Sequence, residues 1–515
     1  MVSQDMVSKV YSMGLYGMDA FVVEAEADLS SGLPAFEIVG LPDAAVREAR
    51  DRVRAALKNM GFRFPVSRIT VNLAPADKRK EGTLYDLPLM IALLRASGQL
   101  DANVEDSAFI GELSLSGEVR PVKGILPMAI HAREAGFRRF YVPEKNAAEG
   151  AVVQGLEVYP VRDLSSLLSH LTGQIQLIPA RPQQPSAEGT FVRPDFADVR
   201  GQEDAKRALE IAAAGMHNAI LIGPPGSGKS MLAKRLPSIL PDMTFDECIE
   251  TTKIHSIAGA LPGGSSMVQT RPFRSPHHTV SPAGLSGGGR IPRPGELSLA
   301  HNGVLFLDEL PEFSRSAMEV LRQPIEDGRV SISRATGSVS YPCSVMLVAA
   351  MNPCPCGYFG HPSKPCICSS SAVSRYLSRV SGPLLDRLDL HIEVPAVEFD
   401  ALDSDERAES SAAIQARVNA ARQIQNERFQ GTGIPCNARI TPDLLHTFCP
   451  LSDAARRLLK KAFDTMGLSA RAYDRVLKVA RTIADLDRSE VIDVIHAAEA
   501  VQYRSLDRKY WMREL

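Results

Sequence analysis

The sequence predicts an α/β protein with an N-terminal α/β domain, a central parallel sheet and a helical C-terminal region. Short apolar or β-branched runs alternate with helical stretches up to about residue 398, and beyond it only helical periodicity remains. A glycine-rich phosphate-loop pattern follows one of the apolar runs. The chain has 515 residues, and at roughly 150 residues per domain this length suggests about three domains.

The composition narrows the class of protein further. Hydrophobic residues make up 44% and charged residues 23%, which excludes a disordered chain. The net charge of -2 argues against a basic exterior and leaves a locally basic channel as the way to hold nucleic acid. Apolar runs stay short of the ~18 residues that span a bilayer, and the N-terminus lacks the pattern of a secretory signal. We therefore expect a cytoplasmic protein without membrane partners.

The first domain is predicted to cover residues 1–178, and a linker with four prolines is predicted at 179–194. The domain combines β-branched runs with helical stretches, of which the first is closed by Gly61. The expected strands are Phe36–Val39, Arg68–Leu73 and Phe140–Pro143, and the expected helices are Ala44–Met60, Leu87–Ser97 and Leu126–Ala135.

A parallel, doubly wound sheet is predicted for residues 195–398. Its expected elements are the strands Ala219–Ile222, Gly303–Leu307 and Ser344–Ala350 and the helices Ala205–Gly215 and Ser230–Leu236. Residues 399–515 are predicted to be a helical region, and its last three helices begin at serines, which are good N-caps. These helices are Leu402–Phe429, Ser452–Met466, Ser469–Leu486 and Ser489–Ser505.

Residues 223–230 fit the pattern G-x4-G-K-[ST] between a predicted strand and a predicted helix. In this context glycines let backbone N–H groups turn toward phosphates, and the helix N-terminus adds a favourable field. We expect Lys229 to reach the β- and γ-phosphates of ATP and Ser230 to bind Mg²⁺. The predicted nucleotide-binding residues are Gly223, Pro224, Pro225, Gly226, Ser227, Gly228, Lys229, Ser230 and Asp308.

Two further strand ends supply candidate catalytic groups. Asp308 and Glu309 follow an apolar strand, and ligands of open α/β sheets bind at that edge. We expect Asp308 to orient Mg²⁺ and Glu309 to polarise the attacking water, although two acids can also form a solvated turn. Asn352, after the next strand, is expected to position water and sense hydrolysis, but asparagine before proline is also common in turns.

Four of the eight cysteines are crowded into one short segment. Four soft ligands suit a tetrahedral structural Zn²⁺, although the C-x-C spacing is tight and His361 offers an alternative ligand. Free thiols, an iron–sulfur cluster and disulfides are the alternatives. The candidate zinc ligands are Cys354, Cys356, Cys366 and Cys368.

Two arginine-bearing segments are candidates for DNA contact. Residues 267–293 contain four arginines, two histidines and no acid, which we interpret as a flexible cationic loop between the two halves of the ATPase site. Residues 328–341 are predicted to form a β-hairpin. Such loops can follow a phosphate backbone without reading bases, and solvent loops without a partner are the alternative. The candidates are Arg271, Arg274, Arg290, Arg293, Arg329 and Arg334.

Over essentially its whole length the chain resembles the magnesium-chelatase-like AAA+ proteins of the ComM/YifB type. The resemblance rests on residues 223–230 and on the strings RPFRSPHHT at 271–279, PGELSLAHNGVLFLDEL at 294–310, AAMNP at 349–353 and SGPLLDRLD at 381–389. It implies ATP hydrolysis with Mg²⁺ by a homo-oligomeric ring, expected to be a hexamer, that moves on DNA. The implied task is branch migration during recombination of incoming DNA, with recombination proteins as candidate partners.

The resemblance also implies roles for two arginines. Arg387 matches the arginine finger that reaches the ATP of a neighbouring subunit, where its charge would stabilise the transferring phosphoryl group. A surface ion pair with Asp386 or Asp389 is the alternative. Arg471 matches the sensor arginine of the helical lid, with Arg475 as the second choice.

The N-terminal block resembles the Lon-type domain with a ribosomal-protein-S5-like fold, through KEGTLYD at 80–86 and GELSLSGEVRP at 111–121. Proteases of that fold use a Ser-Lys dyad, but Leu84 and Leu126 occupy the corresponding positions here, so nucleophile and base are missing. The resemblance thus implies an inactive relative used for ring assembly or for contact with DNA or a partner.

Two alternative functions remain for the whole chain. One is a chelatase-type motor that remodels a partner protein, and the other is an ATP-dependent chaperone or protease.

Overall fold

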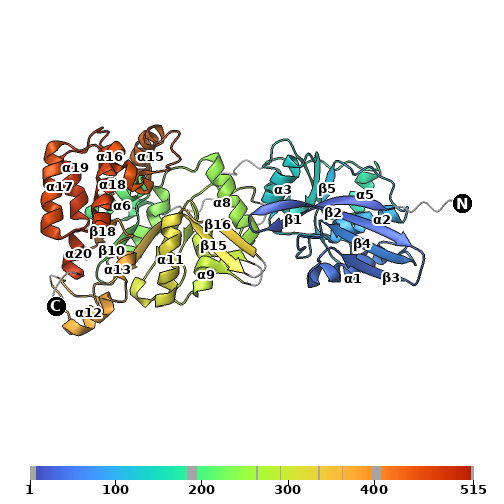
Figure 1. Cartoon of the computed structure of the whole chain (residues 1–515), viewed down its shortest axis with the longest axis horizontal. Coiled ribbons are helices and arrows are strands. Elements are labelled where there is room, and N and C mark those ends of the chain that lie inside the picture. The colour runs from blue at the N-terminus through green and yellow to red at the C-terminus, as the bar shows by residue number, and fades with distance from the viewer. Residues whose placement is uncertain are drawn as a thin grey trace. The chain divides into compact units, whose positions relative to one another are not determined.

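The computed structural model describes residues 7–182, 194–261, 265–289, 292–334, 337–361, 363–396 and 408–511 (Figure 1). Most of the predicted linker lies outside these residues. The chain divides into two compact units, each discontinuous in sequence. Unit 1 comprises Met1–Glu188, Cys248–Val268 and Ser333–Ser340, and unit 2 comprises Gly189–Glu247, Gln269–Ile332 and Tyr341–Leu515.

Unit 1 contains a mixed seven-stranded sheet in the order β3-β4-β2-β1-β5-β8-β9. The pairs β1–β2 and β2–β4 are antiparallel, and the other neighbours are parallel. The three predicted strands correspond to β3, β4 and β8, so that prediction is confirmed. The strands are β1 Ser8–Tyr16, β2 Asp19–Ser30, β3 Ala35–Val39, β4 Arg68–Ala74, β5 Ser107–Phe109, β8 Arg139–Pro143 and β9 Glu157–Val161, with β6 Glu112–Leu113 and β7 Val119–Arg120 as a separate hairpin.

The predicted helices of unit 1 are also confirmed, to within a few residues at each end. Helix α1 (Ala44–Asn59) is capped by the Asp43 side chain, which accepts from the Val46 N–H at 2.8 Å. Gly61 follows it at φ +81°, a conformation that glycine adopts at helix ends. The other helices are α2 Asp86–Ala96, α3 Ile125–Glu134, α4 Ala147–Gly150 and α5 Leu164–Leu171.

Unit 2 is built on five parallel strands in the order β11-β14-β17-β10-β18. Every residue of β10, β14 and β17 is buried, as expected for strands covered on both faces. The predicted central parallel sheet is therefore confirmed. Its strands are β11 Phe273–Arg274, β14 Val304–Leu307, β17 Met346–Met351, β10 Ala219–Ile222 and β18 Leu390–Glu393, and its helices include α6 Glu203–Gly215, α7 Lys229–Arg235, α10 Glu296–Leu299, α11 Arg315–Asp327, α12 Ser370–Leu377 and α13 Gly382–Leu385. Helix α8 (Phe245–Ala258) begins in unit 2, and its residues from Cys248 onward belong to unit 1.

The C-terminal helices gather together in unit 2, drawn in orange to red in Figure 1. Ser452 and Ser469 cap α17 and α18 as predicted, each accepting from the backbone N–H three residues on at 3.2 Å. The predicted helix start at Ser489 is wrong. The guanidinium of Arg481 binds the carbonyls of Ser489 and Glu490, which holds them in a turn, and the helix begins after Asp493. The helices are α15 Ser411–Arg428, α16 Leu445–Phe448, α17 Asp453–Met466, α18 Ala470–Leu486, α19 Val494–Gln502 and α20 Ser505–Tyr510.

The segment 267–293 differs from the single flexible loop that we expected. Phe273 and Arg274 form β11, which pairs with β14 at the edge of the central sheet. Residues further along form helix α9 (Pro282–Ser286) and the short strands β12 (Gly287–Gly288) and β13 (Arg293–Pro294). The second predicted element, the β-hairpin, is confirmed as β15 (Arg329–Arg334) and β16 (Gly337–Pro342).

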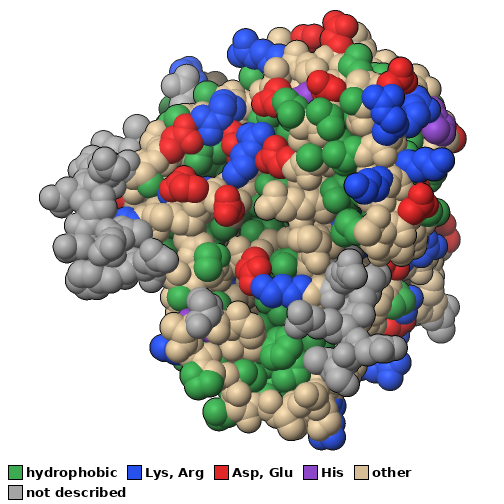
Figure 2. All heavy atoms as spheres, turned by 90° about the vertical axis from the view of Figure 1, so that its left-hand side faces the viewer, with side chains coloured by type: hydrophobic (Ala, Val, Ile, Leu, Met, Phe, Trp, Pro, Cys, Tyr) green, Lys and Arg blue, Asp and Glu red, His purple; other side chains and the backbone are tan. Residues whose placement is uncertain are grey.

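The described surface gives two further observations. On the face drawn in Figure 2, lysines and arginines are interspersed with acidic side chains and form no continuous patch of one sign among the described residues. Among the helices of the described residues, none is long and apolar enough to cross a membrane.

Candidate nucleotide-binding site

The strand register of unit 2 brings three predicted functional segments to one edge of the sheet. Ile222, the last residue of β10, pairs with Met351 of β17, and Leu307 of β14 pairs with Ala349 of β17. The phosphate loop, the two acids and Asn352 each follow one of these strand ends. The carboxyl edge of a parallel sheet is where open α/β folds bind ligands.

The loop between β10 and α7 has the geometry of a phosphate cradle. Gly228 lies at φ +89° and caps α7 in the left-handed region. Gly223 has a steric role instead, because a Cβ atom there would lie 2.0 Å from the carbonyl oxygen of Val394. Both positions therefore favour glycine, as the pattern of a phosphate-binding loop at a helix N-terminus requires.

Lys229 is held at the base of this loop. Its ammonium donates to the carbonyl oxygens of Gly223 at 2.9 Å and Pro224 at 2.8 Å, and to Oδ1 of Asn352 at 3.1 Å. Burial lowers the pKa of Lys229, while the negative charge of Asp308 opposes that shift. Lys229, which we expect to reach the β- and γ-phosphates, is thus directly bonded to Asn352, which we expect to position water.

Ser230 and Asp308 form the group of oxygens suited to Mg²⁺. The hydroxyl of Ser230 donates to Oδ2 of Asp308 at 2.6 Å. Hydroxyl and carboxylate oxygens are ligands that Mg²⁺ prefers, together with phosphate oxygens and water. The residues present therefore fit a magnesium–nucleotide complex.

Glu309 lies beside this pair and has a partner that the sequence did not reveal. Its backbone adopts φ +53°, and its side chain is 62% exposed. Its Oε2 lies 3.5 Å from Nδ1 of His278. The ring centroids of His278 and His277 are 4.0 Å apart, and the ring of His278 contacts that of Phe313 edge-on. His278 therefore lies within ion-pair distance of the carboxylate of Glu309.

Changing His278 to alanine is expected to lower kcat for ATP hydrolysis by roughly fivefold to tenfold, with little change in KM for ATP. The reason is that Glu309 would lose this partner, which we expect to orient it, while the phosphate loop would keep all its contacts. Steady-state ATPase assays check this. A matched His277→Ala change should have a smaller effect, and a loss confined to KM in the His278 variant would contradict the assignment.

A second neighbour of the phosphate loop was also missed. Gln202 precedes α6 at φ +61°, and its amide donates to the carbonyl oxygens of Ser227 at 3.4 Å and Pro395 at 2.7 Å. The sequence does not predict this role, because a glutamine ahead of a helix has no characteristic spacing from the phosphate loop. The contacts make Gln202 a support for the loop from the side of β18.

Arg387 lies at the other end of the sheet. It precedes β18, whose Leu390 pairs with Ala219 at the start of β10, whereas the phosphate loop follows the end of β10. Its guanidinium donates to the carbonyls of Arg322 at 2.8 Å and Pro383 at 2.6 Å. It also pairs with Glu326 at 2.8 Å rather than with Asp386 or Asp389. Arg387 is therefore remote from the phosphate loop of its own subunit.

A pocket of about 350 Å³ brings Arg387 together with Arg471, Arg475 and Lys478 of α18. Arg471 is exposed. Arg475 instead pairs with the buried carboxylate of Asp389 at 3.0 Å. Burial raises the pKa of Asp389, but hydrogen bonding to His217 and the charge of Arg475 hold it well below its ordinary value. Arg475 thus has a structural partner, as Arg387 has in Glu326, whereas Arg471 is exposed at the pocket.

The candidate DNA-contact arginines fall into two groups. The side chain of Arg271 is 8% exposed and pairs with Glu247 at 3.0 Å, and Arg274 makes a two-point ion pair with Glu296. Both guanidinium groups are therefore paired with acidic side chains of unit 2. Arg290 lies outside the described residues. The remaining three are exposed, namely Arg293, Arg329 and Arg334.

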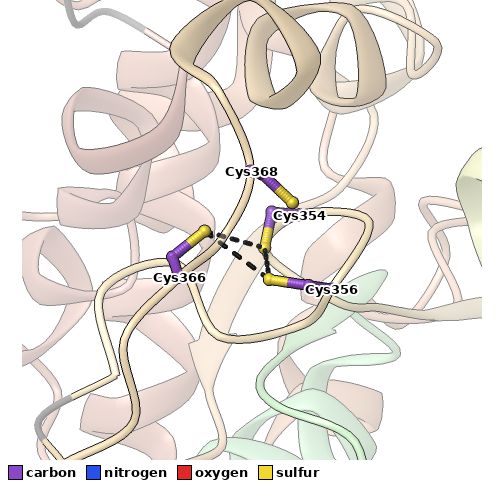
Figure 3. A group of neighbouring side chains, drawn as sticks. All are labelled: Cys354, Cys356, Cys366 and Cys368. Carbon is purple, nitrogen blue, oxygen red and sulfur yellow. Dashed lines mark hydrogen bonds between the residues drawn. The ribbon is translucent and has the colours of Figure 1, made fainter.

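The four clustered cysteines point toward one another, as Figure 3 shows. Their sulfur atoms all lie within 4.8 Å of each other, and the Cys354 Sγ is 3.4 Å from that of Cys356 and 3.7 Å from that of Cys366. A sulfur–sulfur bond is about 2.05 Å long, and all eight cysteines are free. His361 accepts from the backbone N–H of Ser363 and is not a member of the cluster.

Comparison with known proteins gives matches along nearly the whole chain. Residues 195–402 match the family model described as magnesium chelatase, subunit ChlI, residues 25–146 match subunit ChlI of Mg-chelatase, and residues 408–504 match the ChlI C-terminal model. The chain is 45% identical over 508 residues to competence protein ComM of Haemophilus influenzae, covering 97% of each chain. It is 44% identical over 505 residues to YifB of Escherichia coli, covering 98% of each. It is 28% identical over 191 residues to the magnesium-chelatase 38 kDa subunit of Rhodobacter capsulatus, covering 33% of this chain and 54% of that protein.

Proposed function

The chain belongs to the ComM/YifB-type magnesium-chelatase-like proteins. We propose that it is an AAA+ ATPase that assembles into a ring and uses ATP hydrolysis to move along DNA. The proposed task is helicase activity or branch migration during recombination of incoming DNA, in line with the competence protein among its relatives. One observation supports the proposed ATPase activity above the others. Lys229 is bonded to Asn352, and Ser230 is bonded to Asp308, at the same edge of the sheet.

The residues of that edge divide the work of hydrolysis. Lys229 would exchange its loop carbonyls for the β- and γ-phosphate oxygens, and Ser230 and Asp308 would hold Mg²⁺. Mg²⁺ neutralises charge on the phosphates when bound. Glu309 would take the proton of the attacking water, and Asn352 would hold that water in line with the γ-phosphate.

The arginine finger is proposed to act between subunits. Arg387 and Arg471 line one pocket at the end of the sheet opposite the phosphate loop. In a ring, each subunit would present this pocket to the nucleotide of its neighbour, where a guanidinium stabilises the charge of the transition state. We propose a hexamer as the active form, since catalysis would need the neighbouring subunit.

The β15–β16 hairpin is the proposed DNA contact. Val330 and Ile332 are buried on one face, while Arg329 and Arg334 are exposed. Six copies around a ring would concentrate positive charge that the net charge of the monomer conceals. Contact with phosphates rather than bases would suit a motor that moves along any sequence.

Arg334→Ala is expected to reduce DNA-stimulated ATP hydrolysis by roughly threefold or more while basal hydrolysis stays near the wild-type rate, because a phosphate contact is lost. ATPase assays with and without single-stranded DNA at fixed salt check this. Arg456→Ala, at an exposed arginine of α17, is the matched control. Equal loss of both rates in the Arg334 variant would count against the hairpin as the DNA contact.

The N-terminal unit is proposed to be an inactive Lon-like domain that assists ring assembly or DNA contact. Leu126 is fully buried in the hydrophobic core of unit 1, and Leu84 packs against that core. Neither position offers a nucleophile or a base. Casein cleavage by the purified protein would contradict the proposal.

We also propose that the cysteine cluster binds a structural Zn²⁺. Zn–S bonds of about 2.3 Å in a tetrahedron place the sulfur atoms about 3.8 Å apart. The separations between the sulfur atoms of Cys354, Cys356 and Cys366, which are 3.4, 3.7 and 3.6 Å, lie near that value. The N–H of Phe359 donates to the Cys354 sulfur at 3.3 Å, the kind of outer contact that orients a metal ligand.

The test of the DNA-motor proposal is strand displacement on forked or three-stranded DNA with ATP and Mg²⁺. Wild-type protein should displace a strand, and Glu309→Gln should not. The similarity to a magnesium-chelatase subunit favours one alternative, a motor that remodels a partner protein. ATP hydrolysis that DNA does not stimulate, without displacement, would support that alternative.

A further inference from the structure

The cysteine cluster lies directly against the phosphate loop, although the two are far apart in sequence. A Cβ atom at Gly357 would lie 2.4 Å from Cδ and 3.1 Å from Cγ of Pro225. Pro225 belongs to the phosphate loop, and Gly357 follows Cys356. The backbone turn that carries two of the four thiols is therefore in van der Waals contact with the phosphate loop.

A second connection runs along the chain from β17. Asn352 follows this strand and accepts a hydrogen bond from Lys229 at 3.1 Å, and Cys354 is two residues further on and fully buried. The N–H of Gly357 donates to the carbonyl of Cys354 at 3.0 Å, closing the turn. The position of Asn352 and the packing of Pro225 therefore depend on the same turn.

The four thiols are the feature that ties this turn to the rest of the loop. Cys354 and Cys356 lie at its beginning, and Cys366 and Cys368 lie at its end, just before α12. In the described part of the loop, small turns around Gly357 and His361 carry backbone hydrogen bonds, donated by the N–H groups of residues 357, 359, 361, 363 and 364. A metal bound by all four thiolates would close the loop and restrict its backbone, much as a disulfide would.

We propose that the metal in the cysteine cluster controls nucleotide binding, because it holds the turn at Gly357 against Pro225 and fixes Asn352 beside Lys229. The proposal rests on the ATP site and the zinc site proposed above. Loss of the metal would free the turn, and the phosphate loop would lose its support on that side. Nucleotide affinity would then fall although no residue that contacts the nucleotide has changed.

The experiment measures zinc content and affinity for a fluorescent ADP analogue on the same samples of full-length protein. Zinc is removed with chelator and reductant and then added back, and far-UV circular dichroism monitors folding. Removal is expected to raise Kd for the analogue at least fivefold, and added Zn²⁺ is expected to restore it. The Cys366→Ser, Cys368→Ser double variant should show the same rise without recovery.

Two variants separate the contact from the metal. Gly357→Ala keeps all four cysteines but places a methyl group against Pro225, so it should retain zinc and still bind the analogue more weakly. Ile367→Ala shortens an exposed side chain between two of the cysteines, makes no change to the four thiols, and should retain both zinc and affinity. Unchanged affinity in Gly357→Ala would overturn the proposed contact.

The outcomes also distinguish the new proposal from those on which it rests. Zinc-loaded wild-type protein that binds no nucleotide would overturn the proposed ATP site as well. If wild-type protein purified without chelator contains no zinc, the proposed metal site is overturned, and so is the proposed effect of the metal on nucleotide binding. If the protein binds zinc but its nucleotide affinity is the same after zinc removal, only the proposed effect of the metal on nucleotide binding is overturned.

Discussion

Replacing Glu309 with glutamine is expected to lower kcat for ATP hydrolysis by about 10²-fold or more while ATP still binds. Glutamine keeps the size of the side chain but cannot accept the proton of the attacking water. The contacts of Lys229 and the Ser230–Asp308 pair do not involve Glu309, so nucleotide affinity should change little. Single-turnover hydrolysis and equilibrium binding of a fluorescent ATP analogue measure the two quantities separately.

The matched control is Glu312→Gln, three residues further along the chain. Glu312 is about half exposed and pairs with Arg379 at 3.1 Å. An exposed ion pair of this kind contributes little to stability, so hydrolysis should stay near the wild-type rate. Full hydrolysis by the Glu309 variant would show that another group activates the water.

Replacing Arg387 with alanine is expected to reduce ATP hydrolysis by about 10³-fold, the loss typical of a missing arginine finger. Nucleotide binding should persist, because Arg387 lies at the end of the sheet opposite the phosphate loop. Arg387 also contacts Glu326 and two carbonyls, so the variant's melting temperature must be compared with that of wild type. ATPase assays at protein concentrations that favour assembly give the rate.

Mixing two inactive variants tests whether the finger acts between subunits. Arg387→Ala supplies an intact phosphate loop, and Lys229→Ala supplies an intact finger. Mixed rings would contain some complete sites at subunit interfaces, so part of the activity should return. Arg379→Ala, at an exposed arginine, is the control that should stay active alone. Absence of recovery in rings shown to be mixed would contradict an arginine finger that acts between subunits.

The elements of the nucleotide site were predictable because their signals are local. A buried strand, a glycine turn and a helix start within one short stretch define the phosphate loop, and β14 and β17 are continuous apolar runs. By contrast, β1 was not predicted. Its inward-facing positions include Ser8, Ser12 and Gly14, so the alternation of apolar and polar residues that identifies a strand is interrupted.

Side-chain partners distant in sequence explain the other differences. Arg271 and Arg274 are charged residues in a segment without acids, which favours a solvent loop. Their partners, Glu247 and Glu296, lie on either side of that segment, and only the fold brings them together. The same holds for His278, whose place beside Glu309 depends on the route of the chain from β11 to β14. No spacing rule connects such residues.

The opposite placement of the phosphate loop and Arg387 on one sheet also restricts the symmetry of any active assembly. Parallel pairing of β10 and β18 fixes these two groups at opposite ends of the same strands. A two-fold dimer joins identical patches, so the proposed interface, which pairs one end of the sheet with the other, must be head-to-tail instead. In an open head-to-tail chain, one phosphate-loop end and one Arg387 end have no neighbour until the assembly closes on itself. An open chain of any length would therefore carry one subunit whose nucleotide has no finger, and closure alone would complete every site.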